Sequence, residues 1–188
     1  MRVIAGTARG TRLDAVPGDT TRPILDRVKT ALFDILRPRL PGARVLDLFG
    51  GSGAIGIEAL SQGAEHCTFL DLSRAAVETM RANLTRTHLL ERADVRHFDA
   101  FSWLRNSSQT FDLIFVAPPQ YEALWVQAMH LIAERPQLVN PGGQVVVQID
   151  PREYEPLGLT DLTETGQRTY GNTLLVFFER TPSPGDSV

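Results

Sequence analysis

Cysteine is almost absent from this chain of 188 residues, in which Cys67 is the only one. A lone cysteine cannot form a disulfide within the chain, so nothing in the sequence indicates an oxidising compartment. Long apolar runs are also missing, which disfavours a membrane-spanning helix. The opening segment MRVIAGTARG lacks the apolar core of a secretory signal. We therefore expect a cytoplasmic protein without a membrane partner.

Lysine is also scarce, because arginine supplies 18 of the 19 basic residues. The net charge is −3, yet residues 1–44 carry nine basic groups against four acids, a charge of +5, and the remainder carries −8. A basic N-terminal arm on an acidic body favours contact with a polyanion, and the planar guanidinium suits phosphates and base faces. A genome-wide preference for arginine codons would explain the Arg/Lys ratio but not the location. The residues expected to contact nucleic acid are Arg9, Arg22, Arg27 and Lys29.

Alternating strand-like and helix-like segments predict an α/β fold. Residues 2–5 and 11–16 indicate an N-terminal β-hairpin, and an amphipathic helix is predicted from Pro23 to about Leu36. Further strands are predicted near residues 44–49, 66–71, 93–98, 111–116, 143–149, 160–167 and 173–179. Helices are predicted near 54–62, 74–86, 100–105 and 122–134, and Pro141-Gly142-Gly143 indicates a turn.

This order implies right-handed crossovers and a Rossmann-like, seven-stranded, mostly parallel sheet with helices on both faces. We expect one domain over residues 1–180, in which 1–43 form a basic N-terminal extension and 44–180 form the core. The polar, proline-rich residues 181–188 indicate a disordered tail.

The segment RVLDLFGGSGAIG, residues 44–56, carries the most informative motif. A short apolar strand turns on glycines into a helix, which lets a ligand approach the backbone. Gly51-x-Gly53-x-x-Gly56 matches the dinucleotide fingerprint, and Asp71 lies 20 residues after Gly51, where an acid that binds a ribose belongs. Together these features predict a nucleoside-cofactor site.

Asp47, just before the glycines, favours S-adenosylmethionine over a nicotinamide cofactor. A pyrophosphate needs no carboxylate at that point, whereas an ammonium group and a sulfonium are cations that an acid stabilises. The alternative is that Asp47 only caps the glycine turn by accepting backbone N–H groups.

A third acid, Asp99, ends the next predicted strand. It could accept the adenine amine while Ala100 offers a backbone donor, or it could serve as the N-cap of the following helix. The complete set of predicted cofactor contacts is Asp47, Phe49, Gly51, Gly53, Asp71, Leu72, Asp99 and Ala100. No metal is expected.

The strand at 111–116 runs directly into Ala117-Pro118-Pro119-Gln120-Tyr121, the predicted catalytic segment. Two prolines fix the backbone and hold rigid carbonyls that can accept the hydrogens of an exocyclic amine. A nearby aromatic ring can stack a base flipped out of its helix. The alternative is a loop that proline merely stiffens.

The chain resembles the RsmD-type methyltransferases, which modify guanine N2 in bacterial small-subunit ribosomal RNA with S-adenosylmethionine. The resemblance covers residues 1 to about 180 and rests on IAGTARGTRL, TRPILDRVKTALFDIL, DLFGGSGAIGIEALSQGA, Asp71 and YGNTLLVF. It implies a seven-stranded methyltransferase fold, an N-terminal region that contacts RNA, and cofactor positions at Asp47, Gly51, Gly53, Asp71 and Asp99.

One departure separates this chain from the family, whose motif is Asp-Pro-Pro followed by Tyr or Phe. Here Ala117 replaces the acid, and Gln120 precedes the aromatic Tyr121. The hypothesis that follows is a monomeric enzyme that methylates guanine N2 in ribosomal RNA or the small subunit, without an obligatory protein partner. The alternatives are an RNA- or ribosome-binding module without turnover and, less favoured, an oxidoreductase.

Overall fold

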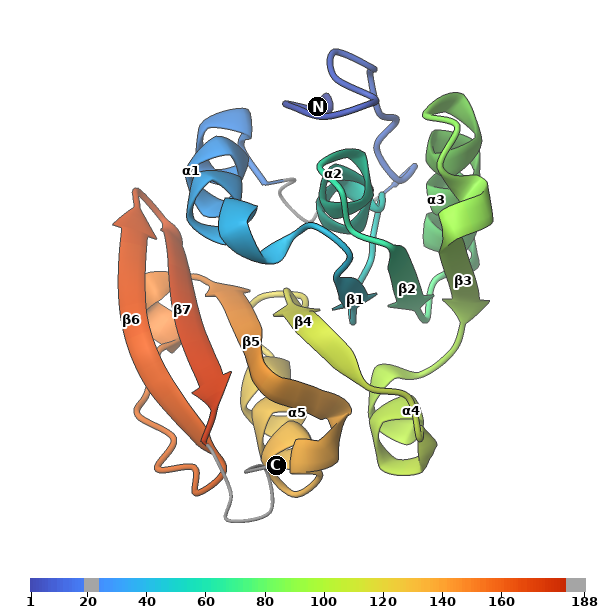
Figure 1. Cartoon of the computed structure of the whole chain (residues 1–188). Coiled ribbons are helices and arrows are strands. Elements are labelled where there is room, and N and C mark those ends of the chain that lie inside the picture. The colour runs from blue at the N-terminus through green and yellow to red at the C-terminus, as the bar shows by residue number, and fades with distance from the viewer. Residues whose placement is uncertain (19–23, 182–188) are drawn as a thin grey trace.

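The computed structural model describes residues 1–18 and 24–181. It contains a seven-stranded sheet flanked by helices (Figure 1). The strands are β1 (Arg44–Asp47), β2 (His66–Asp71), β3 (Ala93–His97), β4 (Phe111–Val116), β5 (Val139–Ile149), β6 (Leu162–Tyr170) and β7 (Thr173–Arg180). The α-helices are α1 (Asp26–Leu36), α2 (Ala54–Ser61), α3 (Arg74–Arg86), α4 (Ala100–Asn106) and α5 (Leu124–Ala133). Short 3₁₀ turns cover Arg37–Arg39, Leu90–Arg92, Pro136–Leu138 and Pro151–Glu153.

The strand order is β3-β2-β1-β4-β5-β7-β6. Strands β1 to β5 run parallel, whereas β7 pairs antiparallel with both β5 and β6. The chain leaves β1 toward β2 and β3 and returns beside β1 as β4, so the direction of winding reverses between β1 and β4. In open α/β sheets, ligands bind at the carboxyl ends of the strands flanking such a reversal.

The helices form two layers, with α1, α2 and α3 on one face of the sheet and α4 and α5 on the other (Figure 1). Each face buries its own apolar cluster, because alternate residues of a strand point to opposite faces. In β4, Phe115 joins the cluster under α1 and α2, and its neighbour Ile114 joins the cluster under α5. No helix in residues 1–18 or 24–181 combines the length and apolar character that crossing a membrane requires.

The structure differs from the sequence-based expectation most clearly at the N-terminus and in β5. The N-terminal hairpin is present but shorter than expected, with one antiparallel bridge between Arg2 and Arg12 and flanking backbone hydrogen bonds that join residues 1–3 to residues 10–13. It does not extend further because the N–H groups of residues 4 and 5 bond to Glu58 of α2 instead. The expected turn at residues 141–143 lies inside β5, where the pairing with β4 shifts register between Phe111 and Leu113. The helix predicted from Pro23 begins at Asp26, and Pro23 itself lies outside the described residues, as do residues 182–188 of the predicted disordered tail.

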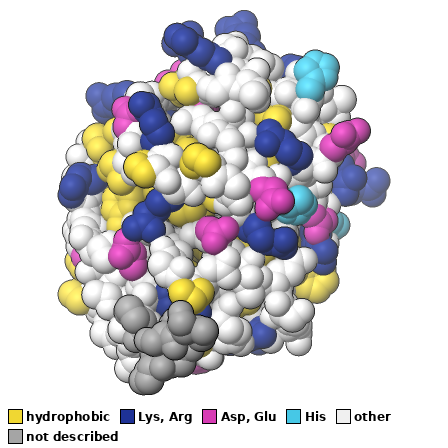
Figure 2. Space-filling view, in the orientation of Figure 1, with side chains coloured by type: hydrophobic (Ala, Val, Ile, Leu, Met, Phe, Trp, Pro, Cys, Tyr) yellow, Lys and Arg dark blue, Asp and Glu magenta, His cyan; other side chains and the backbone are white. Residues whose placement is uncertain are grey.

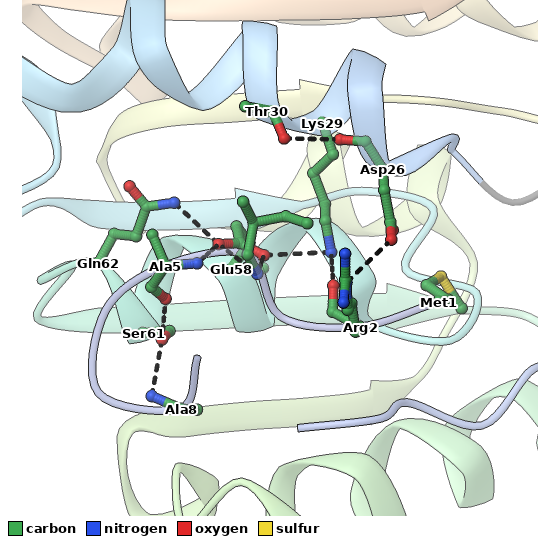
Figure 3. A network of polar contacts seen from close by, with 12 residues as sticks. Met1, Arg2, Ala5, Ala8, Asp26, Lys29, Thr30, Glu58, Ser61 and Gln62 are labelled. Atoms are coloured by element: carbon green, nitrogen blue, oxygen red, sulfur yellow. Dashed lines mark hydrogen bonds and ion pairs between the residues drawn. The ribbon is translucent and has the colours of Figure 1, made fainter. Parts of the chain in front are cut away.

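A buried ion pair attaches the N-terminal segment to the helix layer (Figure 3). The ammonium Nζ of Lys29 lies 3.1 Å from Oε2 of Glu58, and both side chains are fully buried. Lys29 also donates to the carbonyl of Arg2 at 2.5 Å. The Glu58 carboxylate accepts the backbone N–H groups of Ile4 and Ala5, both at 2.9 Å. The prediction that Lys29 contacts RNA is therefore wrong, because a buried ammonium that already has these partners cannot reach a phosphate.

Candidate functional site

Two neighbouring cavities open at the carboxyl ends of the parallel strands. The larger has a volume of about 570 Å³ and extends over the ends of β1, β2 and β3. The smaller, of about 170 Å³, lies over the ends of β1, β4 and β5. They share three lining residues, Val16, Phe49 and Gly51. The two cavities therefore lie side by side at the point where the strand order reverses.

The glycine turn between β1 and α2 separates the two cavities. Gly51 and Gly53 both have positive φ, 55° and 79°, which side-chain-bearing residues rarely adopt. Asp71 braces this turn from the end of β2, because its Oδ2 accepts the Gly51 N–H at 2.9 Å and its Oδ1 accepts the Ser73 N–H at 2.8 Å. Gly51 and Asp71 line the larger cavity, whereas Gly53 lines neither cavity.

Asp47 lies at the end of β1 and lines the smaller cavity with only 3% of its surface exposed. Its Oδ2 accepts the Gly56 N–H at 3.1 Å. Burial raises the pKa of this carboxyl to about 7; the Gly56 hydrogen bond opposes the rise, and the charge of Asp71 adds to it. The capping role foreseen for Asp47 is present, and the same carboxyl still borders the cavity.

The larger cavity combines acids with apolar walls. Asp71 and Asp99 line it together with Phe49, Leu72, Ala100 and Phe101. Asp99 also caps α4, since its Oδ1 accepts the Ser102 N–H at 2.7 Å. The rings of Phe49 and Phe101 meet edge to face, with centroids 6.0 Å apart. Such a site suits a ligand with one flat apolar part and one part rich in hydrogen-bond donors.

The residues that follow β4 do not all line the same cavity. Ala117 lines the smaller cavity and Pro119 the larger, whereas Pro118 and the exposed Gln120 line neither. Tyr121 lines neither of them as well. The sequence-predicted catalytic residues are thus only partly brought together at the cavities.

Tyr121 is tied to the end of β5. Its hydroxyl donates to Oδ2 of Asp150 at 2.8 Å, and its backbone N–H donates to Glu153 at 2.7 Å. The guanidinium of Arg152 lies 5.4 Å from the centre of the Tyr121 ring and bonds Asp150. Hydrogen bonds from Arg152 hold the pKa of Asp150 well below its usual value. These contacts fix the position of the aromatic ring in this structure.

Sequence reasoning missed the N-terminal contribution to the site. Residues Val16, Pro17 and Gly18 line the larger cavity, and Met1, Ala15, Val16 and Ile24 line the smaller. It also missed Phe98 and Phe101, beside the predicted Asp99-Ala100 pair, and Gln148 in β5. The aromatic residues flanking Asp99 were a usable signal, but no motif marks the other positions.

The predicted RNA-contacting arginines do not lie together. Arg9 is exposed in the turn that packs on the carboxyl end of α2, the end away from the glycine turn. Arg27 is exposed on the first turn of α1, and its guanidinium is near Gly171 in the β6–β7 turn, at the cavity edge of the sheet. Arg22 lies outside the described residues. On the face shown in Figure 2, basic side chains are interspersed with acidic ones and form no single patch.

A sheet of this order, with an acid-lined cavity over β1 to β3, defines a Rossmann-like methyltransferase. The chain belongs to the RsmD/YlbH family of class I S-adenosylmethionine methyltransferases, since the family model described as Conserved hypothetical protein 95 matches residues 1–179.

Individual relatives agree with this assignment. The chain is 37% identical over 183 residues to the Bacillus subtilis protein named "Putative rRNA methyltransferase YlbH", covering 96% of this chain and 99% of that one. It is 35% identical over 153 residues to ribosomal RNA small subunit methyltransferase D of Haemophilus influenzae, covering 80% and 79%. A solved structure named "Putative methyltransferase yhhF from Escherichia coli" superimposes with a TM-score of 0.85 at 29% identity, covering 96% of this chain and 97% of that one.

Proposed function

We propose that this protein transfers a methyl group from S-adenosylmethionine to the exocyclic N2 amine of a guanine in small-subunit ribosomal RNA. The observation that carries the proposal is that a cofactor-sized cavity lies next to a smaller one at the end of β4, and that Phe49 and Gly51 line both. The names of the relatives that cover most of this chain support ribosomal RNA as the substrate.

The residues present fit this cofactor. A volume of about 570 Å³ lies inside the usual range for small-molecule sites, about 300–1,000 Å³. Asp71 keeps free lone pairs for the ribose hydroxyls, since each carboxylate oxygen has two and here accepts one backbone N–H. Asp99 and Ala100 serve the adenine, Leu72 supplies an apolar wall, and the buried Asp47 serves the ammonium group.

The chemical step depends mainly on how the reacting atoms are positioned. S-adenosylmethionine supplies a sulfonium methyl group, which reacts in line with an attacking amine nitrogen without prior activation. The backbone carbonyl of Ala117, which lines the smaller cavity, holds the amine, and it is unaffected by the absence of a carboxylate at position 117. Methyl transfer can therefore proceed here because alignment of the reacting atoms supplies most of the acceleration.

Labelled methyl transfer to ribosomal RNA tests the function. Purified protein should label small subunits or their RNA, and digestion should give N2-methylguanosine from one position. Ribosomal RNA from a strain lacking the gene should lose that same modification, and the parent gene should restore it. If no RNA or particle accepts the label and the deletion strain keeps every methylated guanosine, the proposal is rejected.

Replacing Asp71 by alanine should weaken S-adenosylmethionine binding by at least about tenfold, because up to two charge-assisted hydrogen bonds, each worth about 1.5–3 kcal/mol, are lost. Titration calorimetry measures the effect, and thermal unfolding monitors the glycine turn that Asp71 braces. Asp94→Ala, which removes an acid paired with Arg96 on β3, is the matched control and should bind like the parent. Equal affinities for the parent and Asp71→Ala would refute the ribose assignment.

Replacing Arg27 by alanine should weaken RNA binding and lower the slope of log affinity against log salt by about 0.7–0.9, the contribution of one phosphate contact. The exposed position of Arg27 at the cavity edge is the reason. Arg44, exposed at the amino end of β1 and thus at the opposite edge, is the control. Filter binding across a salt series compares them, and an unchanged slope for Arg27→Ala would contradict the prediction. Arg9→Ala should have the smaller effect, because Arg9 lies at the end of α2 away from the glycine turn.

The second candidate function is a ribosome-binding module that keeps the cofactor fold but has no turnover. Ala117 is the observation in its favour, since this side chain borders the smaller cavity without a polar atom. The variant Ala117→Asp separates the two, because it should become active on a particle that the parent binds but does not methylate.

A further inference from the structure

Three neighbouring strands present side chains to the smaller cavity from the same face of the sheet. Asp47 of β1 is in register with Phe115 of β4, and Phe115 is in register with Val146 of β5. Two residues further along, Ala117 and Gln148 therefore face the same way as Phe115 and Val146. All three side chains, those of Asp47, Ala117 and Gln148, line this cavity.

Gln148 is the side chain next to the missing carboxylate. Val116 pairs with Val147, so the following residues, Ala117 and Gln148, stand side by side on adjacent strands, about 4.8 Å apart in backbone spacing. Side chains at such positions contact one another, so a group bound beside Ala117 is also within reach of the Gln148 amide. Gln120, the other candidate acceptor in the sequence, is exposed and lines neither cavity.

The Gln148 amide is also available. Its backbone is held by the pairing of β5 with β7, where Gln148 is in register with Leu175. Within residues 1–18 and 24–181, its side chain has no hydrogen-bond partner, unlike that of Asp150, which is bonded to Tyr121 and Arg152. A half-buried amide that borders a cavity without a protein partner has its hydrogen-bonding capacity left for a ligand.

The chemistry of a carboxamide matches the proposed acceptor base. Its oxygen accepts a hydrogen from an exocyclic amine, and its NH₂ group donates to an adjacent ring nitrogen. On guanine, the N2 amine lies next to the acceptor N3 on the same edge of the base. A carboxylate can perform only the accepting half of this interaction, so an amide can substitute for it and also read the edge.

We infer that Gln148 binds the target amine and replaces the carboxylate that position 117 lacks. This inference rests on the proposed function and adds a substrate-binding residue to it. The reaction forms a nitrogen–methyl bond while the sulfonium carbon–sulfur bond breaks and sulfur keeps the electron pair. The surplus proton of the methylated amine leaves to water, so Gln148 orients the nitrogen and takes up no proton.

The test is single-turnover methylation at saturating S-adenosylmethionine with four proteins besides the parent. Gln148→Leu removes the polar atoms at similar size, and Gln127→Leu, an exposed glutamine on α5, is the matched control. Ala117→Asp and the double variant Ala117→Asp/Gln148→Leu test replacement of one group by the other. Cofactor affinity by calorimetry and thermal unfolding are measured for all five proteins.

Gln148→Leu should lower the methylation rate by about ten- to a hundredfold, the effect of one lost hydrogen bond to a reacting group. Its cofactor affinity should remain within about twofold of the parent, since the adenosine part binds in the larger cavity and Asp47, not Gln148, binds the ammonium group. Ala117→Asp should restore the rate in the Gln148→Leu background by about tenfold or more. Rescue of this kind is not expected if Gln148 only supports the fold.

Two results would overturn the inference while the proposed function stands. One is a Gln148→Leu protein as fast as the parent, and the other is a slow one that Ala117→Asp fails to rescue. A parent that methylates no ribosomal RNA would instead reject the proposed function, and the inference with it.

Discussion

The Lys29→Met variant should lose about 3–5 kcal/mol of folding free energy, the usual result of removing one partner from a buried ion pair. Both Lys29 and Glu58 are fully buried, so removing the ammonium group leaves the Glu58 carboxylate buried without its counter-ion. The loss is a large fraction of the about 5–15 kcal/mol that stabilises a typical domain. Urea unfolding measures it.

The affinity for cofactor should fall in the same variant, because the pair attaches the segment that lines both cavities through Met1 and Val16. The matched control is Arg74→Met, which breaks the exposed pair between Arg74 and Glu78 and should cost less than about 0.5 kcal/mol. The double variant Lys29→Met/Glu58→Gln should recover part of the loss, since no unpaired charge remains. A Lys29→Met protein as stable as Arg74→Met would show that the pair does not stabilise the fold.

The affinity for S-adenosylmethionine should rise about a hundredfold between about pH 5 and pH 7, because the apo protein must release a proton from Asp47 to bind a cation there. Burial raises the pKa of this carboxyl from 3.8 to about 7. Below pH 7 the carboxyl is protonated in the free protein, so each further decrease of one pH unit should weaken cofactor binding about tenfold. Calorimetry across this pH range measures the slope.

The variant Asp47→Asn should abolish that slope and bind weakly at every pH, because its amide carries no charge.

The raised pKa of Asp47 also predicts that the folding stability of the apo protein changes with pH in the opposite direction. Between about pH 4 and pH 7 the folded apo protein holds a proton that the unfolded chain releases, so the contribution of Asp47 to stability falls as the pH rises. Asp47→Asn should therefore melt at a higher temperature than the parent at pH 8. A parent whose cofactor affinity is flat from pH 5 to pH 7 would contradict the assignment of Asp47 to the ammonium group.

Several elements followed from local sequence because their causes are local. The strand at 66–71 and the helix at 74–86 have the predicted bounds, since one is a short apolar run and the other an amphipathic segment with Ser73 as its N-cap. The glycine spacing and the acids Asp47, Asp71 and Asp99 indicated which strand ends carry the site, and the structure places all three beside the cavities. The roles of these residues remain predictions.

Local sequence was insufficient where a residue's role depends on its distant partners. Lys29 looked like one more basic group of the N-terminal arm, and only the approach of Glu58, 29 residues away, shows that it is buried. The hairpin expected at residues 2–16 is limited to the pairing of residues 1–3 with 10–13, because the N–H groups of Ile4 and Ala5 bond to that same carboxylate.

The set of side chains that line the smaller cavity also depends on tertiary structure, because these residues are far apart in the sequence. Gln148 lies 31 residues from Ala117 in the sequence, and strand register brings the two side by side. The sequence alone therefore predicted the class of fold, the glycine turn and the three acids, because each of these depends on residues that are close together along the chain. The packing of strands and of the N-terminal segment decided which polar groups are buried, paired or left free to bind a ligand, because those properties depend on contacts between residues far apart in sequence.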